Sequence, residues 1–137
     1  MFSKIMIPVD LAHMEQLEKA LAVTASLVRQ HNAEAHIVGV TTSAPTPIAK
    51  SPEAFAAKLG EYAADISAKH GVTFIAHSEI SHDPTIDLDD VLERAAHAIG
   101  ADLIVMASHV PGFADRIFAS NAGYLASHSD LSVFVVR

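Results

Sequence analysis

Two places in this chain have the residue types to bind a ligand. Asp10 directly follows an apolar run at residues 5–9, and Ser120 and Asn121 precede a short helical pattern near the C-terminal end. Carboxylate, hydroxyl and amide side chains commonly cap a helix by accepting a backbone N–H hydrogen bond. The N–H groups at a helix start can also hold an anion such as phosphate. The residues alone leave a helix cap and a ligand contact as equal interpretations at both places.

The nine histidines raise the question of a metal site. Two imidazoles share one face of a helix when they are four residues apart, and no two histidines in the chain have that spacing. Asp87, Asp89 and Asp90 could bind a cation together with His82, but acidic residues also stabilise the first turn of a helix. We therefore expect a charged helix start here and no dedicated metal site.

Motifs for covalent or acid–base catalysis do not occur in the sequence. It contains no Walker motif, no nucleophile elbow, no cysteine and no carboxylate pair at a spacing suited to acid–base work. His109 and Arg116 lie between Met106 and Asn121, where each could contact a ligand or face solvent. The sequence thus favours a binding protein over an enzyme.

The composition indicates one globular domain, residues 1–137. The chain is 50% apolar and 18% charged, which is too apolar for a disordered protein and sufficient for a core. Its net charge of −7 argues against a nucleic-acid partner, which requires a basic face. No apolar run approaches the roughly 20 residues that span a bilayer, and residues 1–4 do not resemble a signal peptide. We expect a cytoplasmic protein with no membrane partner.

Short apolar runs alternate with helical patterns along the chain. The runs predict strands at residues 5–10, 35–40, 72–79, 101–109 and 133–136. Helical spacing of apolar side chains predicts helices at residues 12–30, 51–71 and 87–100, with a proline-containing loop at 41–47. This alternation is typical of an α/β domain whose mainly parallel sheet is covered by helices on both faces. Such sheets bind ligands at the carboxyl ends of their strands, where the strand order reverses.

Three segments of the chain resemble the universal stress proteins. They are Lys4–Asp10 (KIMIPVD), Gly100–His109 (GADLIVMASH) and Ser132–Arg137 (SVFVVR), and the likeness covers essentially the whole chain. The resemblance implies a Rossmann-like three-layer α/β sandwich, like that of the adenine nucleotide α-hydrolases, with a mainly parallel sheet in the order 3-2-1-4-5. The first and fourth strands are neighbours in that order, so their carboxyl ends would bring Asp10 and Ala107 to one crevice.

In nucleotide-binding members of this family, that crevice holds ATP through a motif Gly-x2-Gly-x9-Gly-Ser/Thr after the fourth strand. Here Ala107 and Ala119 stand at the first and third glycine positions, Val110-Pro111 occupies the place of the second, and Ser120 follows. The loop is one residue shorter than the motif requires. In this respect the chain resembles a branch of the family that has a shorter loop and carries Ser-His-x-Pro and Gly-Ser-Asn. Alanine costs about 1 kcal/mol where glycine serves a positive φ, and its methyl narrows the space for a phosphate. We therefore expect weak nucleotide binding.

The resemblance implies a nucleotide site made from strand ends and from the loop after the fourth strand. The expected residues are Pro8, Val9, Asp10, Val40, Met106, Ala107, His109, Val110, Ala119, Ser120 and Asn121. The ligand would be ATP or another adenine nucleotide, with no metal beyond nucleotide-associated Mg²⁺.

The resemblance also implies a small regulatory protein of the stress response. By likeness to the family, the last strand, Val133 to Val136, would pair with its twin across a two-fold axis, because an exposed apolar edge strand needs a cover. The alternative is an interaction protein that has lost nucleotide binding and acts through its homodimer surface. Nucleotide hydrolysis and binding of a flavoprotein-type cofactor are further alternatives that rest on analogy of fold alone.

Overall fold

The computed structural model describes residues 1–107 and 123–137, apart from the Thr85 side chain. Its elements in chain order are β1 (Lys4–Val9), the 3-10 helix η1 (Met14–Leu17), α1 (Glu18–His31), β2 (Glu34–Thr41), α2 (Pro52–His70), β3 (Phe74–Ile80), α3 (Pro84–Ile99), β4 (Leu103–Ala107) and β5 (Ser132–Val136). A further helical segment covers residues 123–128. The predicted alternation of strands and helices is confirmed.

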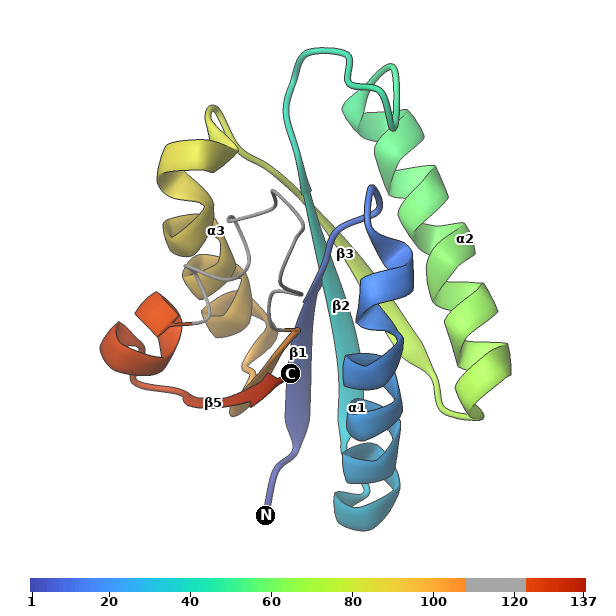
Figure 1. Cartoon of the computed structure of the whole chain (residues 1–137), viewed down its shortest axis with the longest axis vertical. Helices are drawn as coiled ribbons and strands as arrows, with labels where there is room; N and C mark the ends of the chain where they lie inside the picture. The colour runs from blue at the N-terminus through green and yellow to red at the C-terminus, as the bar shows by residue number, and fades with distance from the viewer. Residues whose placement is uncertain (108–122) are drawn as a thin grey trace.

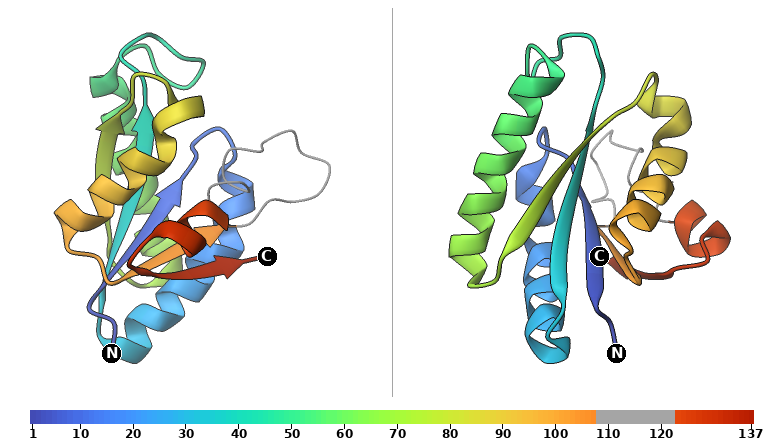
Figure 2. Two further views of the ribbon diagram at one scale, coloured as in Figure 1. Left: turned by 90° about the vertical axis from the view of Figure 1, so that its left-hand side faces the viewer. Right: turned by 180° about the vertical axis from the view of Figure 1, so that it is seen from behind.

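The strands form one five-stranded parallel sheet in the order β3-β2-β1-β4-β5. Helices α1 and α2 cover one face of this sheet and α3 covers the other (Figure 1). Figure 2 shows the same layers from the side and from behind. The predicted fold class and strand order are therefore confirmed. The order reverses at β1, which has β2 on one side and β4 on the other, and a ligand is expected at the carboxyl end of this region.

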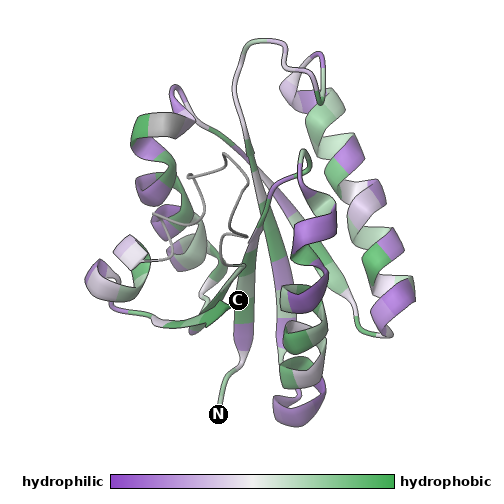
Figure 3. Ribbon diagram, in the orientation of Figure 1, coloured by the Kyte–Doolittle hydropathy of each residue, from purple (hydrophilic) through white to green (hydrophobic). Residues whose placement is uncertain are grey.

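Side chains of the central strands fill a core on each face of the sheet. Ile5 and Ile7 of β1 pack with α1 and α2, Met6 packs with α3, and all three are fully buried. Burial on both faces explains why these strands are continuous apolar runs in the sequence. Figure 3 shows hydrophobic strands in the centre and helices with many hydrophilic residues around them. No helix in the described ranges is both long enough and apolar enough to cross a membrane.

The first helix begins later than predicted. The sequence predicts it from Ala12, but the chain first turns and forms η1, and the α-helix begins only at Glu18. In the turn the His13 N–H donates to the Asp10 carbonyl at 3.0 Å, and the Asp10 carboxylate accepts from the Ala12 N–H at 2.9 Å. These bonds give the backbone an alternative to the helix, so the prediction of a helix start at Ala12 was wrong.

The third helix begins earlier than predicted, at Pro84 rather than at Asp87. The Asp83 carbonyl accepts the N–H groups of Ile86 and Asp87, each at 3.0 Å. Proline suits the first helical position because its missing N–H would have no partner there. The buried Ser81 hydroxyl donates to the Asp87 carboxylate, which ties the end of β3 to the first turn of α3.

Candidate functional site

A cavity of about 210 Å³ opens at the carboxyl ends of β1 and β2, beside the start of α3. Its apolar walls include Val38 and Val40 from β2, Phe55 from α2, and Leu88 and Leu92 from α3. Leu92 is 1% exposed and Val38 is fully buried, so these walls belong to the packed core. The cavity thus lies at the edge of the sheet where open parallel sheets bind their ligands.

Polar groups also line the cavity. They are Asp10 at the end of β1 and three threonines from the end of β2 and the following loop, Thr41, Thr42 and Thr46. The Thr46 hydroxyl accepts the N–H groups of Ile48 and Ala49 at 3.3 and 3.2 Å, and the Thr46 N–H donates to the Ala49 carbonyl at 2.9 Å. This turn folds the predicted loop back towards α2, so the loop carries Thr46 and Ile48 into the cavity wall.

The Asp10 carboxylate is held in a defined position. Its Oδ1 accepts the Ala12 N–H at 2.9 Å, and its Oδ2 lies 3.0 Å from Nδ1 of His13. The side chain of Asp10 is 27% exposed and that of His13 is 33% exposed, so both can still be reached from solvent. Asp10 therefore performs the structural role considered from the sequence, in a turn rather than at a helix cap, and still lines the cavity.

Gly39 allows an aromatic ring to enter the cavity wall. A Cβ added at Gly39 would lie 3.0 Å from two ring carbons of Phe55 and 3.1 Å from a methyl carbon of Leu59. Such separations are shorter than ordinary van der Waals contact, so only glycine lets α2 pack this closely against β2. The position of Phe55 beside the cavity therefore depends on Gly39.

The structure brings three of the expected site residues into the cavity wall, namely Val9, Asp10 and Val40. Pro8 and Met106 are buried within the sheet, and Ala107 is half-buried at the end of β4. Within the described residues, Pro8, Met106 and Ala107 do not line this cavity. The other expected residues, His109, Val110, Ala119, Ser120 and Asn121, lie outside the part of the chain that the structure describes.

Sequence reasoning missed several residues of the site. His13 contacts Asp10, and an Asp-x-x-His spacing directly after a buried strand could have indicated this contact. The glycine inside β2 could have indicated a close approach by another element, although not which one. Thr46, Phe55 and Leu88 come from three separate segments of the chain, and no local pattern joins them.

The cavity suits a flat apolar group attached to a polar one. Its apolar walls can hold a heterocycle, and the Asp10 carboxylate and the threonine hydroxyls can accept or donate hydrogen bonds at its rim. Its volume of about 210 Å³ is below the roughly 300–1,000 Å³ of pockets for drug-sized ligands. The described walls therefore enclose space for one ring system rather than for a whole nucleotide.

Comparison with known proteins gives one consistent family. The Universal stress protein family profile matches residues 1–137. Universal stress protein G of Escherichia coli O157:H7 is 27% identical over 146 residues, which cover 100% of both chains. The crystal structure of a universal stress protein family member from Burkholderia pseudomallei has a TM-score of 0.69 at 25% identity and covers 98% of this chain and 95% of that one.

A further solved structure agrees in fold. The universal stress protein from Archaeoglobus fulgidus in complex with dAMP has a TM-score of 0.72 at 17% identity, over 98% of each chain. The match to the family profile over the whole chain, together with the strand order β3-β2-β1-β4-β5, leads to one conclusion. The chain belongs to the universal stress protein family.

Proposed function

We propose that this protein binds an adenine nucleotide at the cavity beside Asp10 and acts as a binding and regulatory protein in a stress response. The observation that carries the proposal is the cavity itself, which has apolar walls, a carboxylate at its rim and a place at the carboxyl ends of the strands. Family membership and the dAMP bound by the Archaeoglobus protein support the choice of an adenine nucleotide.

In the proposed complex the base enters the apolar slot between β2 and α3, and the ribose reaches Asp10. Among the described residues each Asp10 oxygen has one polar partner, and a carboxylate oxygen can accept a second hydrogen bond. A ribose hydroxyl can therefore donate to Asp10 without opening the turn. The phosphates would extend to the loop after Ala107, where we expect His109, Val110 and Ala119 beside them and Ser120 and Asn121 as polar contacts. Mg²⁺ would arrive with the nucleotide and would have no protein site of its own.

Isothermal titration calorimetry with AMP, ADP and ATP tests this proposal. We expect saturable binding of at least one of these nucleotides at millimolar ligand or below. The Asp10→Asn variant should bind about tenfold more weakly, which corresponds to the roughly 1.4 kcal/mol of one charge-assisted hydrogen bond. Asp65→Asn, an exposed carboxylate on α2 outside the cavity wall, is the matched control and should bind like the wild type. A flat titration with all three nucleotides would refute the proposal.

The position of β5 at the edge of the sheet favours a second candidate function, an interaction protein that acts as a homodimer. Strand β5 pairs with β4 and lies at the end of the sheet, and its Phe134 side chain is 45% exposed. Under this candidate the edge residues Val133 to Val136 pair with a second copy of the chain, which would cover Phe134. Nucleotide binding would then be lost rather than weak, because alanines occupy two of the glycine positions.

Two measurements test the second candidate. Light scattering should give a dimer for the wild type and a monomer for Phe134→Asp, while Ile80→Asp on the opposite edge strand, where the side chain is 53% exposed, should stay dimeric. A monomeric wild type would exclude the dimer. Ala107→Gly combined with Ala119→Gly should create ATP affinity that the wild type lacks if the interaction protein is correct. ATP binding by the wild type would exclude the interaction protein that has lost nucleotide binding.

A further inference from the structure

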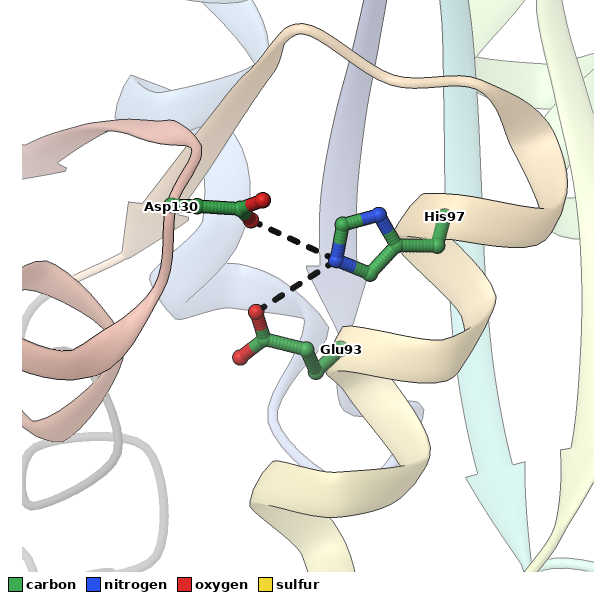
Figure 4. A group of neighbouring side chains, drawn as sticks. All are labelled: Glu93, His97 and Asp130. Atoms are coloured by element: carbon green, nitrogen blue, oxygen red, sulfur yellow. Dashed lines mark ion pairs between the residues drawn. The ribbon is translucent and has the colours of Figure 1, made fainter.

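Three side chains that can bind a metal converge on the outer side of α3 (Figure 4). Nε2 of His97 lies 3.6 Å from Oε1 of Glu93 and 3.4 Å from Oδ1 of Asp130. One ligand atom from each residue lies within 4.8 Å of the other two. Glu93 and His97 are one helical turn apart on α3, and Asp130 comes from the turn before β5. We propose that Glu93, His97 and Asp130 form a binding site for a zinc-type divalent cation, with water completing the coordination.

The two separations from Nε2 of His97 fit zinc, and the ligand oxygens of Glu93 and Asp130 lie within 4.8 Å of each other. Zinc binds histidine nitrogen and carboxylate oxygen at about 2.0–2.2 Å with tetrahedral geometry, which places ligand atoms about 3.3–3.6 Å apart. The distances of 3.4 and 3.6 Å from His97 Nε2 are close to that value, so a cation can enter after small side-chain rotations. An imidazole in the set disfavours Mg²⁺ and Ca²⁺, which prefer oxygen ligands alone.

The surroundings also favour a cation. Glu93 and His97 line a surface hollow together with His82, Asp87, Asp90 and Arg94, so carboxylates outnumber the one arginine. The Ser129 hydroxyl donates to Oε1 of Glu93 at 3.1 Å and so orients that carboxylate towards His97.

The zinc-type site is separate from the proposed nucleotide site. The cavity uses Pro84, Leu88 and Leu92 of α3, whereas Glu93 and His97 line a different hollow beside the same helix, and Asp130 comes from the turn before β5. Metal binding would join α3 to the turn that leads into the edge strand β5. Because a ligand that binds only the folded state raises its stability, zinc should raise the melting temperature by several degrees once it exceeds the dissociation constant.

Metal titrations of the full chain test the site. After treatment with EDTA and removal of the chelator, calorimetry with zinc should give one ion per chain, and Co²⁺ should give the visible absorption of a tetrahedral complex. His97→Ala, Glu93→Gln and Asp130→Asn should each weaken zinc binding at least about tenfold, and Ser129→Ala should weaken it by about tenfold through the misaligned Glu93 carboxylate. Mg²⁺ should produce no change.

Control variants separate this site from other places that could bind zinc. His82→Ala and Asp90→Asn remove a histidine and a carboxylate from the same hollow and should leave zinc binding unchanged. His77→Ala removes one ring of the separate His36–His77 pair on β2 and β3 and should also leave it unchanged. Circular dichroism in EDTA verifies that each variant is folded. Zinc binding that survives in His97→Ala, or that disappears in any of the three controls, would overturn the proposal.

Discussion

Gly39→Ala should destabilise the protein although alanine suits a strand better than glycine. The added Cβ would lie 3.0 Å from the Phe55 ring and 3.1 Å from Leu59, where ordinary contacts are about 3.5–4.0 Å. Phe55 is 5% exposed and Leu59 is fully buried, so neither can move aside into solvent. Overpacking of this kind costs about 1–3 kcal/mol, and the smaller entropy of the unfolded alanine chain returns about 0.4–1 kcal/mol. The net loss should be about 1–2 kcal/mol.

Urea unfolding followed by circular dichroism measures this loss. With an m-value of about 1.5 kcal/mol/M, the unfolding midpoint should fall by about 1 M while the m-value stays the same. Gly60→Ala is the matched control, since nothing lies within 4 Å of a Cβ at that position in α2. It should stabilise the protein by about 0.5–1 kcal/mol, because alanine is the better helix former.

A double-mutant cycle identifies the cause of the Gly39 effect. Phe55→Leu removes the ring that the new Cβ would meet, so Gly39→Ala should cost much less in the Phe55→Leu background. The coupling free energy should be about 1 kcal/mol or more. If Gly39→Ala is as stable as the wild type, or if its cost is the same with and without the ring, the close approach of α2 to β2 is not what requires glycine.

Three further changes test other parts of the fold. Ser51→Ala removes the hydroxyl that caps α2 by accepting the Ala54 N–H at 3.1 Å, and it should lower the free energy of unfolding by about 1 kcal/mol. Urea unfolding measures this loss, and Ser51→Thr, which keeps a capping hydroxyl, is the control. Asp102→Ala removes a carboxylate that accepts the backbone N–H groups of residues 3 and 4 at 2.8 and 3.1 Å. Because these hydrogen bonds are partly exposed, the free energy of unfolding should fall by only about 1–2 kcal/mol. An unchanged midpoint of urea unfolding would contradict this role of Asp102. Burial, then the charge of His36, lowers the pKa of His77 below its ordinary value, so the unfolded chain binds this proton more readily than the folded one. The stability contributed by neutral His77 is therefore present above about pH 6.5 and is lost as the pH falls towards the pKa of His77 in the folded protein. His77→Gln should make the decrease in melting temperature below pH 6.5 less steep, and an unaltered pH profile would show that His77 does not cause it.

The strands and their alternation with helices could be predicted because burial leaves a direct mark on the sequence. Ile104 and its neighbours in β4 are buried on both faces of the sheet, so the strand consists of consecutive apolar residues. The edge strand β3 buries fewer side chains, and its start was placed at residue 72 rather than at Phe74. The order of the strands came from the family resemblance, because periodicity contains no information about which strands are neighbours.

The starts of α1 and α3 were predicted less well than the start of α2, because polar side chains near a helix start can bond to several different partners. The carboxylates of Asp10 and Asp87 are both acceptors close to a helix start, but Asp10 closes a turn that delays the helix, whereas Asp87 lies inside the first turn and accepts from Ser81. The choice depends on contacts with residues that precede the helix. Local propensity cannot distinguish these cases.

The two candidate sites differ in how much of them a sequence can reveal. Glu93 and His97 have the spacing of four residues that places both on one helix face, and a search for Glu-x-x-x-His as well as His-x-x-x-His would have found them. Asp130 lies in a different segment and follows no motif, so only the packing of residues 123–131 against α3 brings it to His97. The cavity is harder still to predict from the sequence, since its wall combines residues of β1, β2, α2, α3 and the loop after β2.

The structural role of Asp10 is compatible with the ligand contact that we propose for it. The Ala12 N–H and His13 hold the carboxylate in one orientation before any ligand arrives, so binding does not have to immobilise the side chain. The same bonds decide which substitution of Asp10 can test the proposed contact with a nucleotide. Asp10→Ala would remove the turn and the ligand contact together, so weaker nucleotide binding in that variant could come from either. Asp10→Asn keeps an oxygen that can accept the Ala12 N–H, removes the negative charge, and therefore reports on the contact with the nucleotide.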